Sequence, residues 1–246
     1  MDIRRYRNAQ SAAEACAVQI LSWLDTAILS SPNGLATLAI SGGSSPALMF
    51  GYFSWLPFTW DRVHVFWVDE RGVPPEDEQS NFRLARDTWF QKAGFPAANI
   101  HRIEAERPPL EAAELYEHEI RQFFDLADDQ LPSFDVIHRG IGTDGHTASL
   151  FPGDPVIEDR SGIAAPVWLE EKQQWRITLL PGVLEAAQNT AILASGADKA
   201  EVIHRVLRGP ADETRWPAQI GAREGFPVVW FLDTAAGAKV AVPQDL

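Results

Sequence analysis

Residues Gly140–Gly153 read GIGTDGHTASLFPG, and the rest of the chain is organised around them. They follow the apolar run Phe134, Val136 and Ile137, which is typical of a buried strand. A short strand that ends in glycines delivers its next residues to the carboxyl edge of a sheet, where open α/β sheets bind ligands. We therefore expect His146, which lies on this glycine-rich turn, to take part in chemistry.

Length and composition limit the class of protein. A chain of 246 residues with 46% hydrophobic residues suits one large α/β domain, residues 1–246, better than two small ones. No strongly apolar stretch approaches the length of about 20 residues that a membrane helix needs. The start, MDIRRYRNAQ, lacks the apolar core of a signal peptide. We therefore expect a cytoplasmic protein that does not bind membranes.

Charge and cysteine content narrow the choice of partners. The net charge of -13 disfavours nucleic acids and anionic membrane surfaces. The single cysteine, Cys16, excludes an internal disulfide, and its alanine-rich neighbourhood favours a plain core thiol. The chain contains no CxxC or HExxH motif and no paired-histidine spacing, so we expect no metal. An acidic protein that binds an anionic molecule must concentrate cations locally, which draws attention to the four lysines, Lys92, Lys172, Lys199 and Lys239.

Short apolar runs alternate with helical patterns along the chain. This alternation predicts a Rossmann-like α/β fold, in which a mostly parallel sheet is covered by helices on both faces. The first helix follows a capping-box pattern formed by Ser11 and Glu14, and its expected core face carries Val18, Leu21, Leu24 and Ile28. The predicted strands are residues 3–7, 35–40, 63–68, 99–103, 134–137, 163–168, 174–180, 190–195 and 227–232. The later helices are expected at residues 47–56, 80–90, 110–127 and 198–207, the third of them with Leu115, Ile120, Phe123, Phe124 and Leu126 in the core and His118 on the surface.

The turn after the second predicted strand is suited to binding an anion. It reads Ser41-Gly42-Gly43-Ser44-Ser45-Pro46, and a proline at a first helical position opens the next helix. Backbone N–H groups at that helix start, together with the two hydroxyls of Ser44 and Ser45, can cradle an anion. The alternative is a tight strand-to-helix turn without a ligand. The pattern is neither a Walker A loop nor a nucleophile elbow, because it lacks their Gly-Lys-Ser/Thr and final-glycine positions.

Charged residues follow other predicted strands. Asp69 and Arg71 stand at the end of the third, as part of either a ligand-facing loop or a solvated turn. Lys199 lies in the first turn of its helix, where a cation opposes the helix dipole unless an anion occupies the helix terminus. Arg176, on a later strand, is a further candidate for the same anion.

His146 has the features of a proton-transfer group. A histidine near its ordinary pKa can take a proton from water at neutral pH, and a carboxylate such as Asp144 can orient it. The glycines Gly140, Gly142 and Gly145 also match the dinucleotide fingerprint GxGxxG. That fingerprint needs a full helix after the glycines, whereas the prolines at 152 and 155 leave room for a turn or two, which disfavours an oxidoreductase.

Several motifs together resemble one family. SGGSSP, DERGVP with a later SN, GIGTDGHTASLFPG, WRITL and GADKA occur in the order seen in 6-phosphogluconolactonases, within the glucosamine-6-phosphate isomerase/deaminase superfamily. The resemblance implies hydrolysis of 6-phosphoglucono-1,5-lactone to 6-phosphogluconate in the oxidative pentose phosphate pathway, without a cofactor. It also implies that His146 is the general base and then the acid, and that Asp144 and Asp69 complete the catalytic group. By the same resemblance, Asp69 would shape the site around the sugar ring and Arg71 would contact the substrate. The phosphate would be held at Gly42, Gly43, Ser44, Ser45 and Lys199, with Arg176 as an addition.

The chain departs from the family pattern at three places. Ser45 replaces a common threonine, and Gly142 with Thr143 stands where a proline often precedes the aspartate. His138 and Arg139 replace an apolar pair, so that Arg139 either adds an anion contact or turns outward.

Two rival functions belong to the same fold. The isomerase/deaminase pattern carries a glutamate five residues beyond the histidine, and here that residue is Phe151, which favours the lactonase. A sugar-phosphate sensor needs an output segment, which the short N-terminal stretch does not supply, and has no evident need for the pair of Asp144 and His146. The sequence leaves the oligomeric state open.

Overall fold

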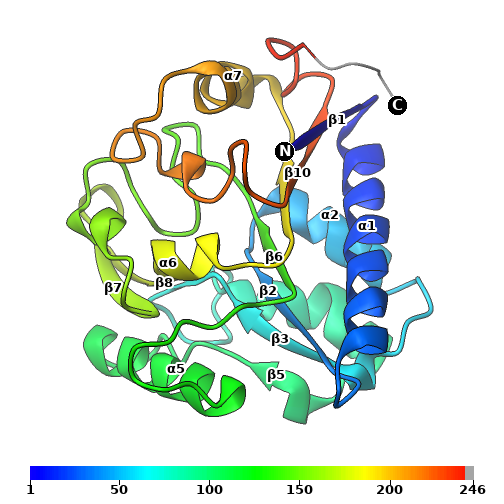
Figure 1. The fold of residues 1–246 in the computed structure, drawn as a ribbon, viewed down its shortest axis with the longest axis vertical. Coiled ribbons are helices and arrows are strands. Elements are labelled where there is room, and N and C mark those ends of the chain that lie inside the picture. Colours follow the sequence, from blue (N-terminus) through cyan, green and yellow to red (C-terminus); the bar gives the residue numbers. More distant parts are fainter. Residues whose placement is uncertain (242–246) are drawn as a thin grey trace.

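Parallel strands form the centre of the computed structural model, which describes residues 1–241. Within those residues, a seven-stranded sheet has the order β1-β10-β9-β6-β2-β3-β5, and every neighbouring pair is parallel (Figure 1). Its strands are β1 Asp2–Tyr6, β2 Ala36–Ile40, β3 Val63–Trp67, β5 Ile100–His101, β6 Val136–Arg139, β9 Thr190–Ala194 and β10 Val228–Asp233. The α/β fold class expected from the sequence is confirmed.

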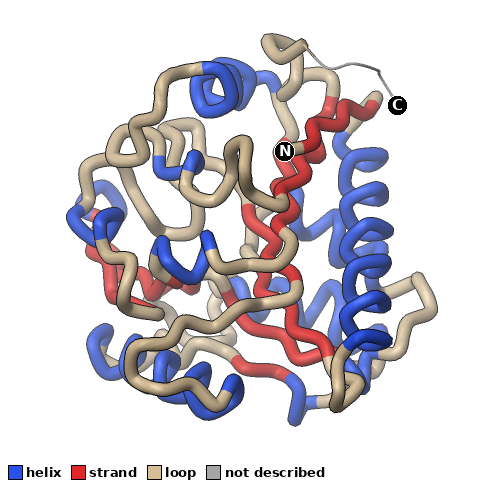
Figure 2. The backbone as a smooth tube through the Cα atoms, viewed as in Figure 1, coloured by secondary structure: helices blue, strands red, loops and turns tan. Residues whose placement is uncertain are grey.

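Helices cover both faces of this sheet. Figure 2 shows the strands running through the middle of the molecule between two groups of helices. On one side lie α1 Ala9–Ser30 and α2 Ser44–Phe53, and on the other lie α5 Pro109–Phe124, α6 Pro181–Glu185 and α7 Ala200–Arg208. The remaining helical segments are α3 Asn81–Ala85, a π-helical turn Arg86–Phe90, α4 Gln91–Ala93 and the 3-10 turns Trp60–Arg62, Ala97–Asn99, Pro155–Glu158, Glu170–Lys172, Ala197–Lys199 and Pro217–Gln219.

Alternation along the strands divides the core into two parts. Successive side chains of a strand point to opposite faces, and on β9 Leu193 joins the larger core cluster whereas Ile192 packs with residues of α7. On β10 the same division separates Phe231 from Trp230. These strands are apolar on both faces, as a parallel sheet covered by helices requires.

A second sheet was not expected. Strands β4 Asp69–Arg71, β8 Gln174–Leu179 and β7 Ala164–Leu169 form a three-stranded antiparallel sheet in the order β4-β8-β7. The short segment after β3 is therefore neither a loop nor a solvated turn, because its backbone pairs with β8 and Asp69 and Glu70 are buried.

Helix α1 differs from its prediction in three respects. Its N-cap is Asn8, whose side chain accepts from the backbone N–H of Ser11, so the capping box at Ser11 is wrong. Val18 is exposed, whereas Leu24 is buried as expected and Leu21 and Ile28 pack partly buried against the core. The other buried residues are mostly small, which allows close approach to the sheet: Ala12, Ala13, Cys16, Ala17 and Ile20. At 22 residues the helix is also long and apolar enough to cross a membrane, so the expectation that no stretch reaches that length is wrong. Here it packs against the sheet and α2 as a core helix.

Cys16 and helix α5 agree with their predictions in part. Cys16 is a buried free thiol, as expected. In α5, His118 is exposed as expected, whereas Leu115 is exposed rather than buried because Tyr116, one position along, turns to the core and bonds the backbone of Trp67.

The order of the strands places a ligand site. From β2 the chain moves outward through β3 and β5, then returns to the other side of β2 with β6 and continues through β9 to β10. The direction of winding therefore reverses between β2 and β6. Open α/β sheets bind ligands at the carboxyl ends of the strands beside such a switch point, and the two loops found there are Ser41–Gly43 and Gly140–His146.

Candidate active site

A cavity of about 370 Å³ opens at this switch point. Strand ends and loops that are distant in the sequence line it. They carry almost all the site residues that the sequence singled out. Asp144 and Arg139 are the two that do not line it. Among residues 1–241, no group of three or more His, Cys, Asp and Glu side chains is placed to hold a metal ion. The lining comprises Ser41, Gly42, Gly43, Ser44, Ser45, Pro46, Asp69, Arg71, Gly140, Ile141, His146, Ala148, Ser149, Phe151, Leu169, Lys172, Arg176, Leu193, Ala194, Ser195 and Lys199.

His146 and Asp144 form a hydrogen-bonded pair. Nδ1 of His146 lies 2.6 Å from Oδ1 of Asp144, which also accepts from the backbone N–H of His146 at 3.1 Å. Burial by itself would raise the pKa of Asp144, but the hydrogen bonds and charge of His146 outweigh it and hold that pKa below its ordinary value. An ionised Asp144 fixes the Nδ1–H tautomer of His146, which leaves the Nε2 lone pair free. Within the described residues, Nε2 makes no hydrogen bond.

The turn after β2 has the geometry of an anion cradle. Gly43 is the N-cap of α2, with φ of 119°, a conformation that residues with a side chain rarely adopt. The N–H groups of Ser44 and Ser45 stand in the first turn, where a helix has no internal partners for them. A Cβ atom at Gly42 would collide with the buried side chain of Asn81, so the close approach of these two segments requires glycine.

Two arginines lie opposite each other on adjacent strands of the second sheet. Arg71 of β4 is paired in register with Arg176 of β8, and both line the cavity. Each has a buried Nε that no group within the described residues satisfies. Burial and then the charge of Arg71 lower the pKa of Arg176. Like charges directly opposite each other are destabilising, so an anion between them would relieve both their repulsion and their unmet donors.

Asp69 lies at the base of the same strand. It is buried, and its Oδ2 accepts from the hydroxyl of Ser149 at 2.7 Å. Its backbone carbonyl accepts from the side chain of Asn81 at 2.8 Å. Asp69 is thus held in place by Ser149, which follows His146 in the chain, and by Asn81, the first residue of α3.

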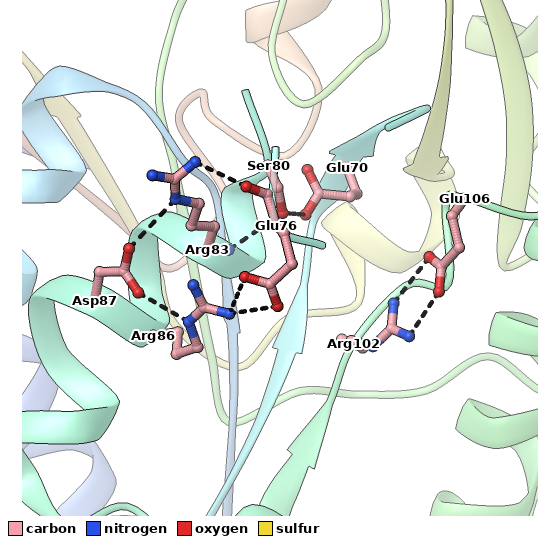
Figure 3. A network of polar contacts seen from close by, with 8 residues as sticks. All are labelled: Glu70, Glu76, Ser80, Arg83, Arg86, Asp87, Arg102 and Glu106. Atoms are coloured by element: carbon pink, nitrogen blue, oxygen red, sulfur yellow. Dashed lines mark hydrogen bonds and ion pairs between the residues drawn. The ribbon is translucent and has the colours of Figure 1, made fainter. Parts of the chain in front are cut away.

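The segment after β4 is anchored by a polar network (Figure 3). The buried carboxylate of Glu70 accepts from Ser80 Oγ at 3.1 Å and from the first N–H groups of α3, at 2.7 Å from Asn81. Arg86 bonds both oxygens of Glu76 at 2.8 Å. Arg71 itself donates to the carbonyl of Gln79 at 2.6 Å. The loop between β4 and α3 is therefore fastened at several points, and Arg71 is oriented by it.

Two lysines line the cavity. Lys199 also lines the cavity as the N-cap residue of α7, one position before the first turn in which the sequence placed it. Lys172 stands on the 3-10 turn between β7 and β8. Sequence reasoning did not place Lys172 in the site, because only the antiparallel pairing of β7 and β8 brings that turn to the cavity. The scarcity of lysine was the one signal that pointed to it.

Arg139 neither reaches the cavity nor turns outward. Its side chain is fully buried and donates to the carbonyl of Ile220. Burial lowers the pKa of Arg139 to about 10, against the opposing charges of Glu185 and Glu213. Both alternatives considered for this residue are therefore wrong, since the last position of β6 directs it into the interior beneath the loop that follows α7.

Comparison with known proteins identifies the family. Residues 7–230 match the family model described as glucosamine-6-phosphate isomerases/6-phosphogluconolactonase. The chain belongs to this family. The resemblance inferred from the motifs is thereby confirmed.

Members of the family with the name 6-phosphogluconolactonase are similar over nearly the full chain. The protein of that name from a Nostoc species is 35% identical over 91% of both chains, and the human one is 32% identical over 94% of this chain and 91% of its own. The solved structure of 6-phosphogluconolactonase from Thermotoga maritima is 25% identical, covers 94% of this chain and 99% of its own, and superposes with a TM-score of 0.80. The Trypanosoma brucei structure, 24% identical, shares the fold with a TM-score of 0.86.

Proposed function

We propose that this chain hydrolyses 6-phospho-D-glucono-1,5-lactone to 6-phospho-D-gluconate, the second step of the oxidative pentose phosphate pathway, in the cytoplasm. Family membership and the names of its relatives support the reaction. The observation that carries the proposal is the bonded pair of His146 and Asp144 in a cavity that also holds an anion cradle and several cations. The reaction consumes only water, so it needs no cofactor.

His146 acts as the base and then as the acid. Its free Nε2 takes a proton from water as the water oxygen bonds to the lactone carbonyl carbon. The negative charge that develops on the carbonyl oxygen collapses as the bond to the ring oxygen breaks, and Nε2 returns its proton to that oxygen. Asp144 holds the imidazole in the required tautomer and stabilises its charged form, as in other histidine–carboxylate pairs.

The phosphate is held by the start of α2 and by the cationic side chains of the cavity. The N–H groups and hydroxyls of Ser44 and Ser45 meet it at the start of α2, and Gly42 and Gly43 let the backbone approach. Arg71, Arg176 and Lys199 supply its counter-charges. Fixing the distant phosphate positions the lactone carbonyl against the water and lowers the entropic part of the barrier.

Phe151 favours hydrolysis over isomerisation. Its ring packs on that of His146, with the centroids 4.8 Å apart, at the position where the isomerase/deaminase pattern carries a glutamate. A phenyl ring can neither accept a proton nor orient an imidazole. It shields one face of His146 and leaves Asp144 as the carboxylate bonded to that histidine.

The test is the rate of 6-phosphogluconate formation from freshly made lactone, measured against the spontaneous rate. We expect the wild type to accelerate hydrolysis, His146→Ala to abolish the acceleration while binding 6-phosphogluconate nearly as well, and Asp144→Asn to lower kcat about 100-fold or more. His118→Ala, on the exposed face of α5, is the matched control and should behave as wild type. Equal loss of product binding in His146→Ala would assign that residue a structural role. Turnover of glucosamine 6-phosphate without lactone hydrolysis would replace the proposal by the isomerase reading.

A further inference from the structure

Two serine hydroxyls in the cavity have no partner. Oγ of Ser41 and Oγ of Ser195 are buried, and no group within the described residues hydrogen-bonds either of them. Both residues line the cavity. Ser41 as a whole is 6% exposed. Neither serine was singled out by its sequence motif.

These orphaned hydroxyls contrast with a neighbour in the same cavity. The hydroxyl of Ser149 donates to Asp69 at 2.7 Å. A buried hydroxyl without a partner destabilises the fold, and nearly all buried polar groups in proteins are paired. Such groups at the wall of a ligand cavity gain their partner when the ligand binds.

The two serines stand on either side of the loop Gly140–His146. Ser41 follows β2, and its backbone N–H donates to the carbonyl of His138 in β6 at 3.1 Å. Ser195 follows β9, whose residue Ile192 pairs with Arg139 at the end of β6. Because β6 lies between β2 and β9, the hydroxyls flank the segment that begins at Gly140 and leads to His146.

We infer that Ser41 and Ser195 bind hydroxyl groups on the sugar ring of the substrate and so select a polyhydroxylated ligand. This inference rests on the proposed function, because it takes the ligand to be a sugar phosphate. A serine hydroxyl both donates and accepts, which matches a sugar hydroxyl. A phosphate only accepts, and the cavity already offers it cationic donors at Arg71, Arg176 and Lys199. A site built to bond a ligand hydroxyl discriminates strongly against ligands that lack it.

The test compares binding with stability in Ser41→Ala, Ser195→Ala and the double variant. Calorimetry gives the Kd for 6-phosphogluconate and for inorganic phosphate, and thermal unfolding without ligand gives Tm. We expect each single variant to bind 6-phosphogluconate roughly 2- to 12-fold more weakly, as the loss of one neutral hydrogen bond predicts. Phosphate affinity should stay the same, and Tm should be unchanged or higher because an unpaired buried hydroxyl is removed.

Ser54→Ala is the control. Its hydroxyl donates to the carbonyl of Gly51 at 2.7 Å at the far end of α2 from the cavity. It should lose a little stability and keep both affinities, which is the reverse of the pattern expected for the cavity serines.

Two outcomes would overturn the inference. The first is equal weakening of phosphate binding, which would place the serines at the phosphate. The second is unchanged affinity for 6-phosphogluconate; a lower Tm beside it would indicate a structural hydrogen bond through water, and a lower kcat would indicate contact with the transition state alone. Failure of the proposed function is distinguishable. If the wild type does not hydrolyse the lactone but binds glucosamine 6-phosphate, the same variants are judged on that ligand, and weakening supports the inference. A wild type that binds phosphate but neither sugar phosphate contradicts it.

Discussion

Gly142 leaves no room for a side chain beside His146. A Cβ atom built on Gly142 would lie closer than 3.0 Å to Nδ1 of His146 and to Oδ1 of Asp144, a separation that real Cβ atoms essentially never show. The backbone N–H of Gly142 also donates to the carbonyl of His146 at 2.8 Å. The turn therefore folds back on itself around the bonded pair, and the glycine is required by space at this point.

Gly142→Ala should displace His146 from Asp144. We expect kcat to fall about 100-fold, since a misplacement of about 1 Å can have an effect of that size. Gly140→Ala is the matched change in the same turn, because its Cβ would meet only the carbonyl of Leu193 at 3.9 Å, an ordinary contact. Steady-state kinetics of both variants test this prediction, and equal activity would show that the pair tolerates displacement.

Lys199→Gln should weaken substrate binding. If Lys199 contacts the phosphate, loss of a charge-assisted hydrogen bond should raise KM about 10-fold or more. Lys92→Gln removes the same charge from α4, on the surface and outside the cavity, and should leave KM unchanged. The pair of variants separates a local contact from the general effect of net charge, and a KM for Lys199→Gln equal to that of Lys92→Gln would remove Lys199 from the phosphate site.

Trp216 packs beside Gly145, in the turn that carries His146. Cε3 of its ring would lie 2.7 Å from a Cβ at Gly145, and the carbonyl of Gly145 accepts from Ala218 at 2.9 Å. We expect Trp216→Ala to lower kcat about tenfold through looser positioning of His146, with a smaller change in KM. Trp216→Phe should restore most of kcat. A variant whose kcat is unchanged although its Tm falls would limit Trp216 to a structural role.

His138 should make the fold sensitive to acid. It is fully buried with no hydrogen bond on either ring nitrogen within the described residues, and burial lowers its pKa to about 3 from an ordinary 6.5. Between these values the unfolded chain binds a proton that the folded chain does not. The free energy of unfolding should therefore fall as pH drops from 6.5 towards 3, by about 1.4 kcal/mol per pH unit from this residue.

His138→Leu removes this contribution. Denaturant unfolding at several pH values should give the variant a shallower loss of stability than the wild type across that window, and similar slopes above pH 7. Parallel curves for the two proteins throughout would show that His138 is protonated in the folded state or is hydrated.

The sequence predicted most of the parallel strands well because they are short apolar runs bounded by glycine, proline or charge, and such runs are local signals. The edge strand β1, which reads DIRRY, is the exception. The sequence predicted strands β7 and β8, but neither β4 nor the separate antiparallel sheet that the three strands form. Strand β4 has three residues, all of them charged, and Arg176, the partner of Arg71, lies about a hundred residues further along the chain. No local periodicity can reveal such a pairing. The N-cap at Asn8 was missed for a different reason, since Asn8 and Ser11 are both good capping residues a few positions apart.

By itself, the sequence determined which loops are the candidate site, those after β2 and β6, because glycines and hydroxyls are adjacent in the first and glycines, Asp144 and His146 in the second. Only the tertiary structure decided what surrounds them. The reversal of winding between β2 and β6 makes the two loops neighbours, and the pairing of β4 with β8 brings Arg176 opposite Arg71. Arg139 is buried because its side chain, at the end of β6, points into the interior. These outcomes depend on strand order and on the face to which a residue points, which are set by packing across the whole domain rather than by neighbours in the chain.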